Sequence, residues 1–213
     1  MARRGSEGSE VFSGIAGGYD RLNRILSLGR DQAWRRSAAK HLPPGRVLDL
    51  GAGTGAANPV FAGREVVALD PQPAMLERNP APLRVVGYGE HLPFADAVFD
   101  GVFSAYVFRN LSSVPATLVE VARVLRPGGV AAIVDLGRPD SGWRRRLHRA
   151  GTAVVLPLAG MTIGARDEYT YLHHSLDSLP PPEEMYASGP LWLERTWRMG
   201  PFGFVYGAML RKV

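Results

Sequence analysis

One short stretch of the sequence, from Arg46 to Gly55, constrains the fold more than any other. An apolar run of strand length ends in Asp49-Leu50, and glycines follow at positions 51, 53 and 55. Glycine allows positive φ and leaves room beside the backbone, so a strand that enters such a turn presents N–H groups to a nucleotide-like ligand. The spacing differs from the Gly-x-Gly-x-x-Gly that holds a pyrophosphate, and no Gly-Lys-Ser/Thr follows for a triphosphate. The turn therefore predicts a cofactor with an adenosine but no phosphate chain.

Strands and helices alternate after this turn. Four more apolar runs of strand length lie at residues 65–70, 83–88, 99–106 and 130–136. An amphipathic helix is expected from Thr117 to Arg126, where Pro127-Gly128-Gly129 end it. The alternation predicts an α/β fold with a mostly parallel sheet and ligands at the carboxyl ends of its strands. The last two apolar runs, at 191–197 and 202–210, are joined by a short Gly-Pro loop and predict an antiparallel pair.

The chain has 213 residues, of which 46% are hydrophobic, enough to bury one good core. We expect a flexible polar leader over residues 1–10 and one domain over 11–213. Apolar residues recur at helical spacing between Val11 and His41, so residues 11–43 are expected to form a helical cap. Residues 141–189 are expected to form a helical insertion on the substrate side.

Composition excludes several classes of function. The chain has no cysteine, which excludes disulfides, zinc sites with cysteine ligands and thiol nucleophiles. No apolar run approaches the length of a membrane span, and the first ten residues lack a signal-peptide core, so we expect a cytoplasmic protein. The net charge of +5 favours contact with an anionic surface, either nucleic acid or the inner leaflet of a membrane.

Two acidic residues end predicted strands. Asp70 follows the glycine turn by about twenty residues, the spacing at which a carboxylate accepts hydrogen bonds from ribose hydroxyls. The alternative for Asp70 is a solvated loop acid or a helix cap. Asp49 either orients the glycine loop or accepts from the cofactor's amino group, and a cap on the following turn is an equal alternative.

These residues resemble the class I S-adenosylmethionine-dependent methyltransferases, through Asp49 to Gly55, Asp70 and the Leu125-Arg126-Pro127-Gly128-Gly129 that precedes the fifth strand. The sequence is most similar to the C-methyltransferases that complete the rings of menaquinone and ubiquinone. The further matching motifs are Phe12 with Tyr19-Asp20, Asn23 and Ser27; Trp34-Arg35; Phe108-Arg109-Asn110; Glu168-Tyr169-Thr170-Tyr171-Leu172 with Ser175; and Gly200-Pro201-Phe202-Gly203.

The resemblance implies a Rossmann-like fold with a seven-stranded, mostly parallel sheet, an antiparallel C-terminal strand pair and an N-terminal helical extension. It implies S-adenosylmethionine as cofactor, a prenylated quinol of the demethylmenaquinol type as substrate, and no metal. The implied cofactor-binding residues are Asp49, Gly51, Gly53, Thr54, Gly55, Asp70, Tyr88, Gly89 and Ala105. The implied catalytic residues are Arg109, Asn110, Tyr19, Tyr171 and His174.

Methylation of a quinol ring carbon needs a neighbouring hydroxyl to lose its proton, because the phenolate makes that carbon nucleophilic. Arg109 would stabilise the phenolate, since its guanidinium stays charged, and by resemblance it would relay the proton through water. The alternative for Arg109 is a salt bridge or a helix cap. Tyr19 and Asn23 would close the pocket, and Tyr171 and His174 would contact the ring from the other side, with His174 as a candidate base or else a surface residue.

The sequence departs from the family in four places. The segment after Asp70 is trimmed and contains four prolines, at positions 71, 73, 80 and 82. Pro59 stands in the short run between Gly55 and the second strand, so the first crossover helix must be very short. The family usually has Asp or Asn followed by Ala where this chain has Tyr88-Gly89; Tyr88 either stacks on adenine or offers its hydroxyl, or fills space left by the shortened helix. His173-His174 replace the family's Pro-Glu, which leaves the exact quinol open.

Residues 143–160 combine a basic segment with an apolar one. Arg144, Arg145, Arg146 and Arg149 precede an apolar run at 153–159. This pattern is typical of a membrane-facing lid with arginines on anionic headgroups, and equally of a helix that packs on the domain and carries a solvated charged end.

A nucleic-acid methyltransferase is disfavoured. No Asn/Asp-Pro-Pro-Tyr/Phe follows the fourth strand, which reads Ser104-Ala105-Tyr106-Val107-Phe108, and the covalent route to cytosine carbon-5 needs a cysteine. No basic stripe interleaved with aromatic residues is present beyond the arginine cluster, so no nucleic-acid partner is expected. A methyltransferase of another small molecule stays the alternative, and the sequence leaves a homodimer open.

Overall fold

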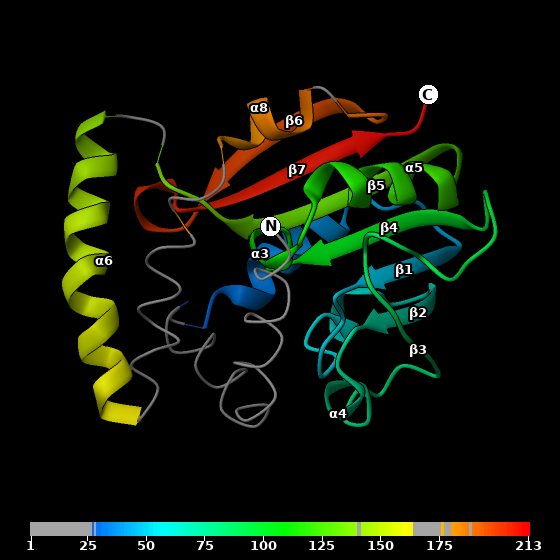
Figure 1. The fold of residues 1–213 in the computed structure, drawn as a ribbon, viewed down its shortest axis with the longest axis horizontal. Coiled ribbons are helices and arrows are strands. Elements are labelled where there is room, and N and C mark those ends of the chain that lie inside the picture. The colour runs from blue at the N-terminus through cyan, green and yellow to red at the C-terminus, as the bar shows by residue number, and fades with distance from the viewer. Residues whose placement is uncertain (1–26, 28, 140–141, 164–175, 177–179, 188) are drawn as a thin grey trace.

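The computed structural model describes residues 27, 29–139, 142–163, 176, 180–187 and 189–213 (Figure 1). Its centre is a seven-stranded sheet in the order β3-β2-β1-β4-β5-β7-β6. The strands are β1 (Arg46–Leu50), β2 (Glu65–Asp70), β3 (Leu83–Val86), β4 (Phe99–Ala105), β5 (Leu125–Leu136), β6 (Trp192–Met199) and β7 (Val205–Arg211). Neighbouring strands from β3 to β5 are parallel, whereas β7 is antiparallel to both β5 and β6. The predicted fold class is therefore confirmed.

The helices of the described residues lie on both faces of the sheet and at one end of it (Figure 1). They are α3 (Asp31–Ala39), α4 (Pro73–Leu76), α5 (Val114–Val124), α6 (Gly142–Ile163) and α8 (Pro182–Ala187). Three short 3₁₀ segments are η1 (Asn58–Val60), η2 (Phe108–Asn110) and η3 (Pro201–Gly203). The described part of the chain contains no helix long and apolar enough to cross a membrane.

Alternate residues of β1 face two different parts of the core, because side chains of a strand point to opposite faces. Val47 packs with Trp34 and Ala38 of α3, whereas Leu48 packs with Leu118 of α5. Both faces of the central strands are therefore covered, which explains why β1 and β2 are nearly continuous apolar runs. The same alternation turns the side chain of Asp49 toward the face that α3 covers.

The crossovers beside the glycine turn are short, as Pro59 and the proline-rich segment after Asp70 predict. η1 has three residues and α4 has four. The helix expected from Thr117 to Arg126 instead spans Val114–Val124. Ser113 begins it by accepting a hydrogen bond from the Ala116 N–H at 3.3 Å, and Leu125 ends it because that residue pairs with Phe99 in the sheet.

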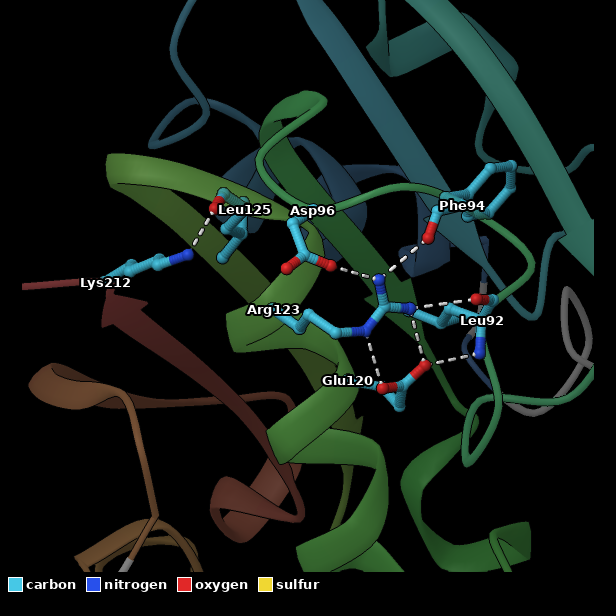
Figure 2. Close-up of polar contacts among 7 residues, drawn as sticks. All are labelled: Leu92, Phe94, Asp96, Glu120, Arg123, Leu125 and Lys212. Carbon is cyan, nitrogen blue, oxygen red and sulfur yellow. Dashed lines mark hydrogen bonds and ion pairs between the residues drawn. The ribbon is translucent and has the colours of Figure 1, made fainter.

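Arg123 at the end of α5 fixes the loop that leads into β4 (Figure 2). Its guanidinium donates to the carbonyl oxygens of Leu92 and Phe94 and pairs with Asp96 and Glu120, at distances of 2.7–3.0 Å. Glu120 in turn accepts from the Leu92 N–H at 2.7 Å. A half-buried cation thus satisfies several polar groups of one loop, whose preceding residues 87–90 form part of the cavity described below.

Replacing Arg123 by Ala should lower the free energy of unfolding by about 1–3 kcal/mol, because the loop carbonyls and Glu120 lose their shared donor. The hydrogen bond from Arg123 lowers the pKa of Glu120, so this stabilisation is present above the unfolded-state pKa and is lost as the pH falls through the lowered value. Urea unfolding at several pH values measures both effects. Arg78→Ala, at an exposed position, is the control; equal losses in the two variants would contradict the assignment.

Candidate functional site

A cavity of about 210 Å³ opens at the carboxyl ends of β1, β2 and β4. This is the edge at which a parallel α/β sheet places its ligands. The glycine turn, the end of β2, the loop after β3 and the loop after β4 form most of its wall, and α3 adds Arg35. Of the predicted cofactor residues, Gly51, Gly53, Thr54, Asp70, Tyr88, Gly89 and Ala105 line the cavity; Asn110 of the predicted catalytic set lines it too.

The glycine turn needs its glycines for different reasons. Gly51 and Gly55 have φ of 72° and 88°, and a Cβ atom would come within 2.3 Å of Val107 at Gly51 and within 2.4 Å of Asn58 at Gly55. A Cβ at Gly53 would meet no atom within 4 Å, although its φ of 51° is also positive. The first and third glycines therefore allow close packing of the turn, whereas the second borders open space in the cavity.

Asp70 holds the turn from the end of β2. Its carboxylate accepts the Gly53 N–H and the Gln72 N–H, each at 2.9 Å. Burial raises the pKa of Asp70, and these two backbone hydrogen bonds oppose the rise. A carboxylate offers about four acceptor positions, so two remain for a ligand in the cavity that Asp70 lines.

Asn79 supports the turn from behind, and sequence reasoning missed it. Its side-chain N–H donates to the Gly53 carbonyl at 3.0 Å, and its side-chain oxygen accepts from the Ala81 N–H at 2.9 Å and from Asn58 at 3.0 Å. Buried amide groups need hydrogen-bond partners. Here the hydrogen bonds of Asn79 replace contacts that a longer crossover helix would have made with the turn. An asparagine among prolines is typical of a surface loop, so the sequence carried no signal for this role.

The loop after β3, residues 87–90, forms another part of the cavity wall. Tyr88 is 58% exposed, so its ring borders the cavity rather than filling space left by the shortened crossover. Gly89 packs closely, since a Cβ there would come within 3.1 Å of Thr117. Glu90 accepts from the N–H groups of Ser112 and Ser113 at 2.8 and 3.1 Å, which ties this wall to the start of α5.

Several buried polar atoms near α3 have no hydrogen-bond partner. In the described part of the chain such atoms are Gln32 Oε1, Arg35 Nε, Asp49 Oδ2, Tyr106 Oη and, elsewhere in the structure, Arg46 Nε. The Arg35 guanidinium lies 5.0 Å from the centre of the Tyr106 ring, and Tyr106 has a positive φ of 66°. Sequence reasoning assigned no role to Arg35 or Tyr106, because only the packing of α3 against the sheet brings Arg35 close to Asp49 and over the Tyr106 ring.

Asp49 lies fully buried behind this wall. Burial raises the pKa of its carboxyl to about 7, the nearby Arg35 charge lowers it, and the Asp70 charge raises it further. The carboxylate therefore changes its protonation state close to neutral pH.

Arg109 is buried in an ion pair rather than exposed in the cavity. Its guanidinium donates to Asp135 at 2.9 Å, and Asp135 also accepts the N–H groups of Phe108 and Leu136 at 2.8 and 2.7 Å. The next residue, Asn110, reaches the cavity. Asp135 was missed in the sequence because it reads as part of an apolar strand. Tyr19, Asn23, Tyr171 and His174 lie outside the described residues, and no group of His, Asp or Glu suited to a metal occurs within them.

Comparison with solved structures identifies the class of fold. A methyltransferase from Haloferax volcanii, solved with its Trm112 activator, has a TM-score of 0.66 at 18% identity, over 95% of this chain and 97% of that chain. An S-adenosylmethionine-dependent methyltransferase from Thermotoga maritima also gives 0.66, at 17% identity, over 96% of this chain and 99% of that chain. The fold is that of the class I S-adenosylmethionine-dependent methyltransferases.

Sequence comparison then identifies the family. The ubiE/COQ5 methyltransferase family matches residues 2–188, and the chain belongs to it. The demethylmenaquinone methyltransferase of Thermus thermophilus is 39% identical over 83% of this chain and 88% of that protein. The corresponding enzyme of Deinococcus radiodurans is 37% identical over 85% of this chain and 82% of that protein. The chain is therefore an S-adenosylmethionine-dependent methyltransferase by family.

Replacing Asp49 by Asn should stabilise the protein at pH 8 and much less at pH 5. Because the folded-state pKa is raised from 3.8 to about 7, Asp49 contributes stability that is lost as the pH rises through about 7. The neutral amide avoids that loss, so the free energy of unfolding at pH 8 should rise by up to about 4 kcal/mol.

Urea unfolding at the two pH values measures this difference. Asp100→Asn is the control with the opposite sign, since the Arg46 N–H lowers the pKa of Asp100 and that variant should lose stability at pH 8. An Asp49→Asn effect of equal size at both pH values would contradict the raised pKa.

Proposed function

We propose that the chain transfers the methyl group of S-adenosylmethionine to a ring carbon of a prenylated quinol, converting a demethylmenaquinol to a menaquinol. The main support is the cavity lined by the glycine turn, Asp70 and Asn110, in a chain whose relatives are named demethylmenaquinone methyltransferases. The relative from Geobacter sulfurreducens is named a ubiquinone/menaquinone biosynthesis C-methyltransferase. The alternative is methylation of another small molecule.

The residues at the Asp70 end of the cavity fit an adenosine. The two acceptor positions left on Asp70 match the two ribose hydroxyls, and Leu69, Met75 and Tyr88 offer an apolar wall to adenine. Gly51, Gly53, Thr54, Gly55, Gly89 and Ala105 complete the proposed cofactor site. When bound, the cofactor supplies a methyl group already activated on a sulfonium, so the protein has to align two centres and exclude water.

Arg109 and Asn110 are proposed to act on the quinol. Asp135 accepts from the Phe108 N–H and pairs with the Arg109 guanidinium, which fixes η2 and the guanidinium beside Asn110 after the end of β4. A fixed cation there would favour the phenolate form of the substrate. Tyr19, Tyr171 and His174 are proposed to contact the ring as well.

We also propose that the enzyme is cytoplasmic and contacts the anionic face of a membrane through the first half of α6. One side of α6 packs on the body, where His148 stacks on Phe204 at 5.6 Å and Thr152 accepts from Arg138 at 2.8 Å. Away from these contacts, Trp143 and Leu147 are spaced one helical turn apart and are 63% and 51% exposed. The side chains of Arg146 and Arg149 in this half of the helix are also exposed, whereas Arg145 borders a small pocket with Gly137 and Arg138 of the body, and the helix has no acidic residue.

Such a surface suits the interface of a bilayer, because tryptophan and leucine enter the acyl boundary and arginines bind lipid phosphates. Figure 1 shows α6 at one end of the molecule, to one side of the sheet. A membrane-bound position would bring a polyprenyl quinol to the enzyme without passage through water.

Methyl transfer to reduced demethylmenaquinone tests the proposed function. The chain with radiolabelled S-adenosylmethionine should place the label in menaquinone. Asp70→Ala should weaken cofactor binding by about 1–3 kcal/mol, measured by calorimetry, because the ribose hydroxyls lose their acceptor. Transfer to another small phenol, together with none to the quinol, would favour the alternative function.

Vesicle flotation tests the membrane contact. The chain should float with vesicles that contain phosphatidylglycerol and much less with phosphatidylcholine alone. Arg146→Glu/Arg149→Glu should abolish the difference, whereas Lys40→Glu/Arg78→Glu changes the net charge equally at exposed positions outside α6 and should preserve it. Equal partitioning of the wild-type chain with both vesicles would overturn the electrostatic part of the proposal.

A further inference from the structure

A second, smaller pocket lies where the end of β5 meets α6, β6 and the start of α8. Its volume is about 20 Å³, and it shares no lining residue with the larger cavity. Three of its lining residues are arginines that come from three separate parts of the fold: Arg138 follows β5, Arg145 lies on α6 and Arg198 lies on β6. Among the described residues that line the pocket, none is acidic. The pocket therefore concentrates positive charge.

Arg138 is the most buried of the three arginines, with 5% of its surface exposed. Its guanidinium donates to the Thr152 hydroxyl at 2.8 Å and lies 3.2 Å from Nδ1 of His148, and both of these partners are on α6. His148 is itself held by stacking on Phe204. A guanidinium has five N–H donors in a rigid fork, so Arg138 can bind an anion in addition to its protein partners.

Arg198 reaches the pocket from the opposite side. Its guanidinium lies 5.8 Å from the centre of the Tyr206 ring and donates to the Arg138 carbonyl at 3.4 Å. Gly137 permits this approach, because a Cβ there would come within 3.2 Å of Tyr206 and 3.4 Å of Arg198. Arg145 is exposed and borders the same pocket from α6. Two of the three guanidinium groups are thus oriented by the fold before any ligand binds.

The size and the charge of the pocket together limit what it can bind. Three like charges around one small space repel each other, and an anion between them removes that repulsion. A volume of about 20 Å³ admits one or two oxygen atoms and excludes a nucleotide or a whole sugar phosphate. The fork of a guanidinium matches the oxygens of a phosphate. A phosphodiester that inserts its unesterified oxygens and keeps its two substituents outside satisfies both limits.

The pocket opens beside the half of α6 that we assign to the membrane. Trp143 and Leu147 are exposed on that half, and Arg145 lies between them in the sequence. Figure 1 shows α6 next to the end of β5 and the start of β7, where Arg138 and Tyr206 are found. A phospholipid in the adjacent leaflet therefore has its phosphate at the level of the pocket when these two apolar side chains enter the acyl boundary.

We propose that Arg138, Arg145 and Arg198 form a binding site for the phosphate group of an anionic phospholipid. The site rests on the proposed membrane contact and adds to it a selection among headgroups. A zwitterionic headgroup would bring a quaternary ammonium close to three guanidinium groups, so phosphatidylglycerol binds in preference to phosphatidylcholine. The bound phosphate also joins α6 to β5 and β6, since each of these parts supplies one of its arginines.

Calorimetry on the full chain with a short-chain lipid tests the site without a membrane. Dihexanoyl-phosphatidylglycerol, kept below its micelle concentration, should bind at least about tenfold more tightly than dihexanoyl-phosphatidylcholine. Arg145→Gln and Arg198→Gln should each weaken the anionic lipid by roughly 5–20-fold, because each removes a charged donor. Arg146→Gln is the matched control, since Arg146 is exposed on the same helix and does not line the pocket, and its affinity should change by less than about twofold. Melting temperatures of the variants check that they are folded.

Inorganic phosphate in the same titration distinguishes the two sources of the group. Phosphate that binds as tightly as the lipid would overturn the lipid assignment and indicate a site for the free ion. Equal affinity for the two lipids, or equal losses in Arg145→Gln and Arg146→Gln, would overturn the site itself. Failure of the membrane contact alone leaves binding of the monomeric lipid intact, whereas failure of the site alone leaves flotation with anionic vesicles intact. Neither result alters the methyl-transfer assay, so the proposed reaction is tested separately.

Discussion

The hydrogen bond from the Gly53 N–H to the Asp70 carboxylate joins the two features on which the site depends. One is the glycine turn, whose positive φ angles and close packing require glycine. The other is the end of the neighbouring parallel strand. Because β1 and β2 are in register, the turn and the acid meet without a long crossover helix between them. Asn79 and Asn58 supply from the shortened crossover the contacts that a full helix would have made. The cavity retains its shape because these polar contacts replace the missing packing.

The wall of the cavity near α3 contains buried polar groups that lower the stability of the free protein. The buried Arg35 guanidinium and the buried Tyr106 side chain border the cavity, and the Asp49 carboxyl, with a pKa of about 7, is buried near Arg35. A better-packed set of apolar residues would raise the stability of the free protein. Asp49 should therefore make a large contribution to the pH dependence of unfolding.

The Arg109–Asp135 pair shows why a motif alone does not define a role. The sequence placed Arg109 after the fourth strand and left both a catalytic role and a salt bridge open. The structure contains the salt bridge, formed with an acid inside β5 that binds two backbone N–H groups as well. A buried pair of this kind fixes the orientation of the guanidinium. The positive charge would then be in position before a substrate binds. The catalytic role of Arg109 stays a prediction.

The sequence by itself determined the α/β class, the mostly parallel sheet with its antiparallel C-terminal pair, the glycine turn with Asp70, and the family. These features depend on local patterns: apolar periodicity, the position of glycine and the spacing of one acid. Only the tertiary structure placed Arg35 near Asp49 and over the Tyr106 ring, Asn79 behind the turn, and Asp135 beside Arg109. Those contacts join residues that are far apart in the chain, and no local pattern of the sequence predicts which of them meet. Packing of α3 and of neighbouring strands brings them together, because the sheet fixes which strand ends meet.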